Sequence, residues 1–251
     1  MHDPAYAPYK SVPQTLYHRL WVYKREVESI QKASAVTAVS EYTESVARGV
    51  FPQLPVVHGV PNWVRTDVFF PAIRTLPGKP FRLLFVGNVS ARKGEDILVK
   101  TMARLGSGFQ LSYTGNPEDF SKPTELPDNM VPLGKIMGPC AMAEVYRAHD
   151  AFLFPSRLEG LPLSVLEAAS SGLPVIASNC SSLPEVVRHR ETGLLCKMDD
   201  VSAFVDAVQL LADFPDIWGA MSSNARQLMK ANFAMERAVD RYVDIYRSVA
   251  R

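Results

Sequence analysis

The chain has 251 residues, with an apolar share of 47% and a charged share of 21%. Both shares are close to the averages for soluble globular proteins, so they exclude a disordered, collagen-like or coiled-coil chain. The net charge is +1, which leaves no overall field to hold a polyanion. Nucleic acid is therefore not an expected partner, and any anion site must be local.

The cysteines and the hydropathy pattern bear on the compartment. Cys140, Cys180 and Cys196 form no CxxC pair, and we expect them to be buried thiols of a reducing compartment. The sequence has no uncharged apolar run of about 18 residues, and its first residues lack the apolar region of a signal peptide. These features predict a cytoplasmic protein.

The first part of the chain alternates between helical and extended patterns. Apolar residues at helical spacing predict a helix over residues 14–33, and a short apolar run predicts a strand over 35–39. Ser40 is a typical N-cap for the next helix, which Gly49 is expected to end. The proline-rich stretch 54–80 predicts a strand and then a connection. We place a domain boundary near residue 75.

From residue 81 onward the sequence repeats a unit of apolar strand, polar loop and amphipathic helix. Runs such as LLFV and AFLF are apolar at successive positions, which is typical of strands buried on both faces of a parallel sheet. The pattern predicts an α/β fold with a doubly wound parallel sheet, whose ligand crevice lies beyond the carboxyl ends of the strands. The predicted strands are 82–86, 110–114, 130–133, 151–154, 174–177 and 193–196, and the predicted helices are 95–105, 141–148, 163–171, 183–188, 201–212, 217–231 and 235–249.

The loop after the first of these strands has the chemistry of a phosphate site. Its sequence, VGNVSARKGED, spans residues 86–96 and lacks the spacing of a Walker A loop or a dinucleotide-binding G-x-G-x-x-G turn. Gly87 allows a tight turn, the following helix offers free N–H groups, and Arg92 and Lys93 add positive charge. Phosphate binding is one interpretation, and a solvated basic turn is the other.

A second loop combines carboxylates with a helix start. In FPSRLEGLPLSVLEAASSGLPVIAS, residues 154–178, Glu159 precedes the predicted helix and Glu167 lies within it. Backbone amides of residues 160–164 suit a phosphate or a sugar hydroxyl, and a carboxylate can hold a vicinal diol with two hydrogen bonds. The alternative is that each glutamate is a solvated surface residue.

Taken together, these segments resemble a known family. Glu159 and Glu167 enclose seven residues, and the segment resembles the E-x7-E signature of retaining glycosyltransferases of the two-domain GT-B type, most closely family 4. VGNVSARKG is similar to that family's G-R-L-x-x-x-K-G loop, and PNWVRTDVFFP, residues 61–71, to its interdomain segment. TAVSEYTESV and LPEVVRHRETGLLC also follow its pattern. The resemblance therefore covers almost the whole chain.

The resemblance implies a role for each matching residue. Lys93 would contact the donor diphosphate, Glu167 the ribose hydroxyls and Glu159 the hydroxyls of the transferred sugar. His2 matches the family histidine that faces the donor sugar, so Glu159 and His2 are the implied catalytic residues. Asn88 stands where the family has a diphosphate arginine. Either Arg92 supplies that charge or the donor binds more weakly. The other implied donor-binding residues are Gly87, Gly160, Leu161, Pro162, Leu163 and Ser164.

The resemblance also implies a domain organisation. Residues 1–75 correspond to part of an acceptor-side N-terminal domain, because MHD resembles the end of one of its middle strands. Residues 76–232 correspond to the Rossmann-like nucleotide-sugar-binding domain, and residues 233–251 to a helix that packs back on the N-terminal part. We expect self-association or a partner to complete the first domain, and negligible turnover by this chain alone.

The implied function is transfer of a sugar from a UDP-, GDP- or ADP-sugar to a glycan, a lipid-linked or a small-molecule acceptor, without a metal or other cofactor. An inactive or split nucleotide-sugar-binding fragment and a nucleotide-sugar epimerase of the same architecture are the alternatives.

Tyr17, Trp21 and Lys24 fall on one side of the first predicted helix, with Arg19 and Arg25 nearby. Such a face suits peripheral contact with a membrane or a lipid-linked acceptor, and packing on a missing domain explains it equally well.

Overall fold

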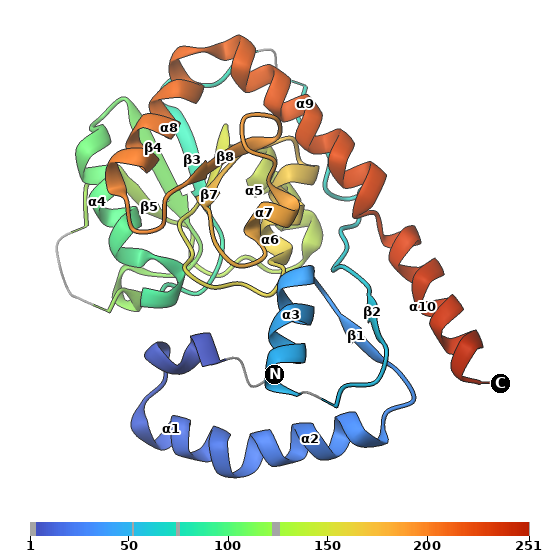
Figure 1. Ribbon diagram of the computed structural model, residues 1–251. Coiled ribbons are helices and arrows are strands. Elements are labelled where there is room, and N and C mark those ends of the chain that lie inside the picture. The colour runs from blue at the N-terminus through green and yellow to red at the C-terminus, as the bar shows by residue number, and fades with distance from the viewer. Residues whose placement is uncertain (1–3, 52, 74–75, 122–125, 251) are drawn as a thin grey trace. The chain divides into compact units, whose positions relative to one another are not determined.

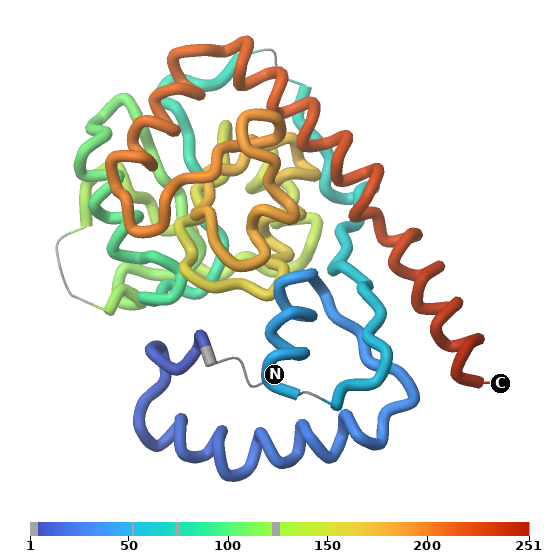
Figure 2. Tube along the Cα trace, viewed as in Figure 1, coloured from blue at the N-terminus to red at the C-terminus, as the bar shows by residue number. Residues whose placement is uncertain are grey.

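The computed structural model of the protein describes residues 4–51, 53–73, 76–121 and 126–250. The chain is traced in Figures 1 and 2. It forms two compact units, one from Trp63 to Met235 and the other from the residues up to Asn62 together with those from Glu236 onward.

In the described part of the larger unit, six parallel strands form one sheet in the order β5-β4-β3-β6-β7-β8. The central strands are the most apolar, and every residue of β6 and β7 is buried. This architecture confirms the predicted α/β fold with a doubly wound parallel sheet. The strands are β3 (Phe81–Phe85), β4 (Phe109–Tyr113), β5 (Met130–Pro132), β6 (Ala151–Phe154), β7 (Val175–Ser178) and β8 (Gly193–Cys196).

Helices cover both faces of this sheet. Helix α4 packs against α8, while α6 packs against α5 and α9, and Figure 1 shows these two groups on opposite sides of the strands. The predicted helices all occur, with ends that differ by a few residues. For example, α5 and α9 begin earlier than predicted because a proline occupies the first turn of each. The helices are α4 (Glu95–Leu105), α5 (Pro139–Arg147), α6 (Leu163–Ser170), α7 (Leu183–Val186), α8 (Val201–Asp213) and α9 (Pro215–Asn232).

The strand order reverses between β3 and β6. From β3 the chain moves outward to β4 and β5, then returns to pair β6 with the other side of β3, at Leu83–Ala151 and Leu84–Phe152. Beyond these two strands the chain therefore continues over opposite halves of the sheet. In an open parallel sheet this reversal is where a ligand crevice forms.

The smaller unit contains a two-stranded parallel sheet in which Val36 pairs with Val57 and Ala38 with Gly59. The helix predicted over residues 14–33 is a succession of α1, η2 and α2. It begins at Val12, before the predicted residue 14, because Ser11 caps α1 in a capping box with Gln14. Arg241 donates a hydrogen bond to the Gly59 carbonyl. The elements are η1 (Pro4–Tyr9), α1 (Val12–Tyr17), the π-helical turn η2 (His18–Val22), α2 (Tyr23–Lys32), β1 (Val36–Ala38), α3 (Glu41–Val50), β2 (Val57–Gly59) and α10 (Met235–Val249).

The smaller unit exposes apolar surface. Tyr17 and Trp21 are each 61% exposed, and both border an apolar hollow of about 720 Å³ that also reaches β1 and Phe51. Among the described residues, no helix is both long and apolar enough to cross a membrane.

The segment after Asn62 belongs structurally to the larger unit. The Val64 amide donates to the Phe233 carbonyl, and the Arg226 guanidinium on α9 donates to the carbonyls of Thr66 and Phe69. The contacts therefore divide the chain at Asn62–Trp63, whereas composition places the boundary near residue 75. The reason is that backbone carbonyls, which composition does not reveal, fix this stretch to α9.

The three cysteine thiols are free and lie in different environments. Cys196 is buried, and this burial raises the pKa of its thiol to about 12. Cys180 is half-buried, but Cys140 is exposed on the first turn of α5. The expectation of three buried thiols is therefore wrong for Cys140, because a helix turn that begins at the surface leaves its outer positions in solvent.

Asp150, which precedes β6, ties this strand to the start of β3. Its buried carboxylate accepts hydrogen bonds from the amides of Gly78 and Arg82, at 3.1 and 2.8 Å. The Arg82 guanidinium forms an ion pair with the same group at 3.2 Å. A buried charge is stable only when it is paired in this way.

We expect Asp150→Ala to lower the free energy of unfolding by about 3 kcal/mol, because two backbone amides lose their acceptor inside the fold. The guanidinium of Arg82 keeps partial access to water, so most of the loss should come from the amides. Urea unfolding followed by circular dichroism measures the change. Asp150→Asn retains one acceptor oxygen and should lose clearly less, and equal losses for both variants would contradict this explanation.

Candidate functional site

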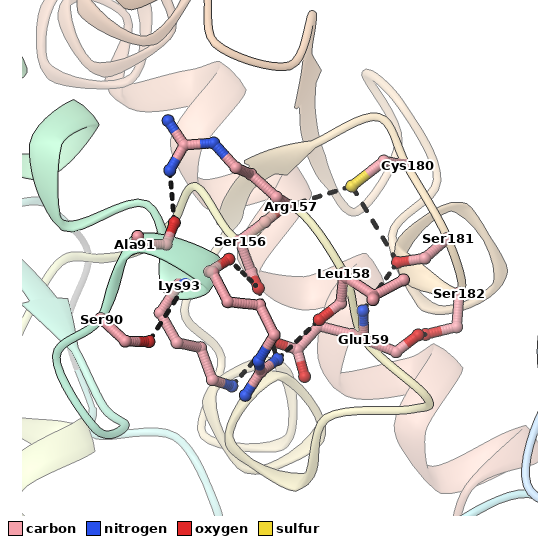
Figure 3. Close-up of polar contacts among 11 residues, drawn as sticks. Ser90, Ala91, Lys93, Ser156, Arg157, Leu158, Glu159, Cys180, Ser181 and Ser182 are labelled. Atoms are coloured by element: carbon pink, nitrogen blue, oxygen red, sulfur yellow. Dashed lines mark hydrogen bonds and ion pairs between the residues drawn. The ribbon is translucent and has the colours of Figure 1, made fainter. Parts of the chain in front are cut away.

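Two loops meet where the strand order reverses. The loop after β3 runs into the short 3-10 helix η3 (Ala91–Lys93), which Ser90 caps, and then into α4. The loop after β6 carries Ser156, Arg157, Leu158 and Glu159. Because β3 and β6 are neighbours in the sheet, their carboxyl ends bring these loops side by side, as Figure 3 shows.

A buried ion cluster joins the two loops. One oxygen of Glu159, Oε1, lies 2.7 Å from Lys93 Nζ and 3.2 Å from Arg92 Nη1. The Ser156 hydroxyl donates to the same oxygen at 2.5 Å. The side chains of Glu159, Lys93 and Arg92 are only 8%, 12% and 25% exposed. Lys93 and Glu159 are therefore not the solvated surface residues that the alternative interpretations required.

The cluster holds more positive charge than negative charge. Burial lowers the pKa of Lys93, although Glu159 opposes this effect. The Lys93 ammonium also lies 4.7 Å from the centre of the Phe154 ring, and Arg92 donates to the Leu158 carbonyl. Because poorly hydrated cations interact strongly with anions in a low dielectric, the cluster is suited to bind a further negative group.

Arg157 fixes the distance between the loops. Its amide donates to the Arg92 carbonyl at 2.8 Å, and its guanidinium donates to the Ala91 carbonyl. The guanidinium also forms ion pairs with Asp96 on α4 and with Asp199. The backbone around Arg92 and Lys93 is thus held in place independently of Glu159.

A third loop supports Glu159 from the side of β7. The Ser181 hydroxyl accepts from the Glu159 amide at 3.0 Å, and the Ser182 hydroxyl donates to the Glu159 carbonyl at 3.2 Å. Figure 3 shows these serines and Ser156 around the Glu159 backbone and side chain. Sequence reasoning missed all three serines. The available signal was that each lies just after a buried strand, where small hydroxyl side chains can reach a neighbouring loop.

The second glutamate, Glu167, lies on α6 in a different environment. Tyr146 on α5 donates from its hydroxyl to Glu167 Oε2 at 3.0 Å. Burial raises the pKa of Glu167, and this hydrogen bond opposes the rise. Sequence reasoning missed Tyr146, because nothing in the spacing of the two residues shows that α5 and α6 pack together.

The structure brings some of the predicted site residues together and leaves others apart. Arg92, Lys93 and Glu159 form one cluster, and a Cβ atom on Gly87 would lie 3.9 Å from Lys93 Nζ. Asn88 is exposed. Gly160, Leu161 and Pro162 lead into α6, and Leu163 and Ser164 are its first two residues. The N-terminus of α6 has no side-chain cap. His2 lies outside the described residues. Within the described ranges, no group of three or more His, Cys, Asp or Glu side chains is placed to hold a metal ion.

Gly94 permits the close approach of the two loops. It has φ +75°, and a Cβ at this position would lie 2.2 Å from the Pro155 carbonyl oxygen. We expect Gly94→Ala to cost at least about 2 kcal/mol of unfolding free energy, from the backbone conformation together with this clash. Chemical denaturation measures the change.

Gly134 provides a matched control for this variant. It also has positive φ, but the nearest atom to an added Cβ is 4.0 Å away. Gly134→Ala should therefore cost only the backbone term, about 1 kcal/mol. A Gly94→Ala variant that is no less stable than Gly134→Ala would show that the loops are not held this closely.

Comparisons with known proteins agree with this architecture. The sequence model of the family "Glycosyl transferases group 1" matches residues 80–213, from β3 through α8. The sucrose-phosphate synthase of Thermosynechococcus elongatus aligns with a TM-score of 0.81 and 26% identity over 90% of this chain and 61% of that one. Anabaena HepE, solved with UDP and glucose, aligns with a TM-score of 0.77 and 16% identity over 91% of this chain and 66% of that one.

Curated relatives extend the similarity in sequence. D-inositol 3-phosphate glycosyltransferase 1 of Catenulispora acidiphila is 31% identical over 216 residues, which are 76% of this chain and 51% of that enzyme. The chain spans about half the length of the first curated relatives that it matches. With the family match over more than half of its residues, the chain belongs to the group 1 family of glycosyl transferases.

Proposed function

We propose that this chain carries the donor site of a retaining, metal-independent glycosyltransferase of family 4, which moves a sugar from a nucleoside diphosphate to an acceptor. The observation that carries the proposal is the buried cluster of Lys93, Arg92 and Glu159 at the carboxyl edge of the sheet. Two cations share one carboxylate there, so one positive charge remains to attract an anion.

Lys93 and Arg92 would bind the donor diphosphate. Their positions are set by η3 and by Arg157, so they are in place before the ligand arrives. As the bond to the sugar breaks, negative charge grows on the departing diphosphate, and fixed cations in a site with little water stabilise that charge. The uncapped first turn of α6 would add backbone N–H groups to the same binding site.

Glu159 would exchange partners when the donor binds. With its cations turned to the diphosphate, its carboxylate is available to accept hydrogen bonds from hydroxyls of the transferred sugar. Ser181 and Ser182 hold the backbone of Glu159 during this exchange, because they bind its amide and carbonyl and leave the carboxylate alone.

Glu167 would bind the ribose. Its carboxylate has no cation partner among the described residues, and its oxygens can accept hydrogen bonds from two neighbouring hydroxyls. Support for a nucleotide donor also comes from the fold neighbour HepE, whose structure holds UDP and glucose.

The proposal is tested by calorimetry of the chain with UDP, GDP and ADP at moderate salt. We expect one of the three to bind at the carboxyl edge of the sheet. The sugar conjugates of that nucleotide are then tested for transfer with the full-length protein, by release of free nucleoside diphosphate and formation of a new glycoside. Absence of binding by all three at millimolar concentration would contradict the site assignment.

Lys93→Ala should weaken binding of the nucleoside diphosphate by roughly 1.5–3 kcal/mol, because a charge-assisted hydrogen bond to phosphate is lost. Lys100→Ala is the matched control, since Lys100 lies on the exposed side of α4, where it pairs with Asp96. Calorimetry compares the two variants. The role given to Lys93 is wrong when both variants bind as tightly as the parent chain.

Glu167→Gln should weaken binding of the nucleoside diphosphate by roughly 1 kcal/mol or more, because the hydrogen bonds from the ribose lose their charged acceptor. Inorganic pyrophosphate has no ribose, so its binding should change little. Parallel titrations with both ligands measure the difference, and equal losses would mean that Glu167 does not act on the ribose.

A further inference from the structure

Tyr146 is a fully buried tyrosine whose hydroxyl lies against α6. Its ring packs edge-on against Phe69 and tilted against Phe152, with centroids 5.8 and 6.0 Å away. The hydroxyl is 3.0 Å from Glu167 Oε2 and 3.2 Å from the Ser164 carbonyl oxygen. The aromatic packing fixes the ring, so the position of the hydroxyl is fixed as well.

The hydroxyl has one proton and two neighbouring acceptors. The Ser164 carbonyl lies in the first turn of α6, where it can accept a hydrogen bond from a backbone N–H of the next helical turn. The carboxylate of Glu167 is the stronger acceptor because it is charged. Across the described ranges, the hydrogen bond from Tyr146 is the contact that holds this carboxylate. It occupies one lone pair of Oε2 and leaves Oε1 available.

Two arginines on the neighbouring helices are held by groups other than Glu167. On α9, the Arg226 guanidinium binds the carbonyl of Ser170, at the far end of α6. On α5, Arg147 forms an ion pair with Glu144. Burial raises the pKa of Glu167, and the hydrogen bond from Tyr146 counteracts this rise. Burial also raises the pKa of Tyr146 well above its usual range, so Tyr146 remains a donor.

We propose that Tyr146 is a positioning residue that holds Glu167 by one oxygen and directs the rest of the carboxylate toward the ribose hydroxyls of the donor. The inference rests on the role proposed for Glu167. Tyr146 does not touch the donor in this arrangement and acts only through the glutamate.

The test compares Tyr146→Phe with the parent chain in two measurements. The first follows the Glu167 carboxyl carbon by NMR in the free protein, where loss of the hydrogen bond should raise the pKa of Glu167. The second measures UDP, GDP or ADP binding, whichever the parent chain binds, as a function of pH. Affinity should fall roughly 2- to 10-fold at neutral pH, and the acidic limb of the profile should move to higher pH, because Glu167 must be ionised to accept from the ribose.

Tyr113→Phe is the matched control. Tyr113 is also fully buried, and its hydroxyl has no hydrogen-bond partner among the described residues. This variant should change neither measurement. Pyrophosphate binding should be the same in all three proteins.

Two outcomes would overturn the inference. One is that the pKa of Glu167 is unchanged in Tyr146→Phe. The other is that Tyr146→Phe weakens nucleotide binding by the same factor in the Glu167→Gln variant as in the parent chain. A parent chain that binds none of the nucleotides would instead refute the proposed function, while the titration of Glu167 would still decide whether Tyr146 acts on it.

Discussion

The arrangement of the site depends on one constraint, which is that the buried carboxylate of Glu159 must be paired. An unpaired carboxylate in the interior would cost several kcal/mol. Glu159 meets this requirement with Lys93 and Arg92 from the loop after β3 and with Ser156 from its own loop. Because these partners come from different strands, the requirement also fixes how the loops lie against each other.

The sheet supplies the geometry that this constraint needs. Strands β3 and β6 are neighbours, yet the chain leaves them in opposite directions across the sheet. Their loops therefore meet at the carboxyl edge of the sheet. Gly94 and Arg157 maintain the approach, the first by leaving space beside Pro155 and the second through hydrogen bonds and ion pairs. These contacts hold the two loops of the ion cluster together.

The two glutamates of the E-x7-E segment have different electrostatic surroundings. Glu159 is neutralised by cations, whereas Glu167 accepts a hydrogen bond from the neutral Tyr146 hydroxyl. This difference is in keeping with the separate roles proposed for them, one beside the diphosphate and sugar and one beside the ribose.

Much of the fold could be predicted from the sequence. Apolar runs such as AFLF mark the buried parallel strands, and the alternation of strands and helices from residue 81 onward indicates the doubly wound sheet. These signals are local, because burial on both faces and helical periodicity are properties of short segments. The charges of Arg92, Lys93, Glu159 and Glu167 are likewise visible in the sequence, which leaves open whether these side chains are solvated or gather in a site.

Only the tertiary structure decided which of these groups meet. Lys93 and Glu159 are far apart in the sequence, and their contact depends on β6 returning beside β3. The supporting roles of Tyr146, Ser181 and Ser182 depend on how α5 and the loop after β7 pack. Strand order and helix packing arise from the burial of apolar surface over the whole unit, which no short segment encodes by itself.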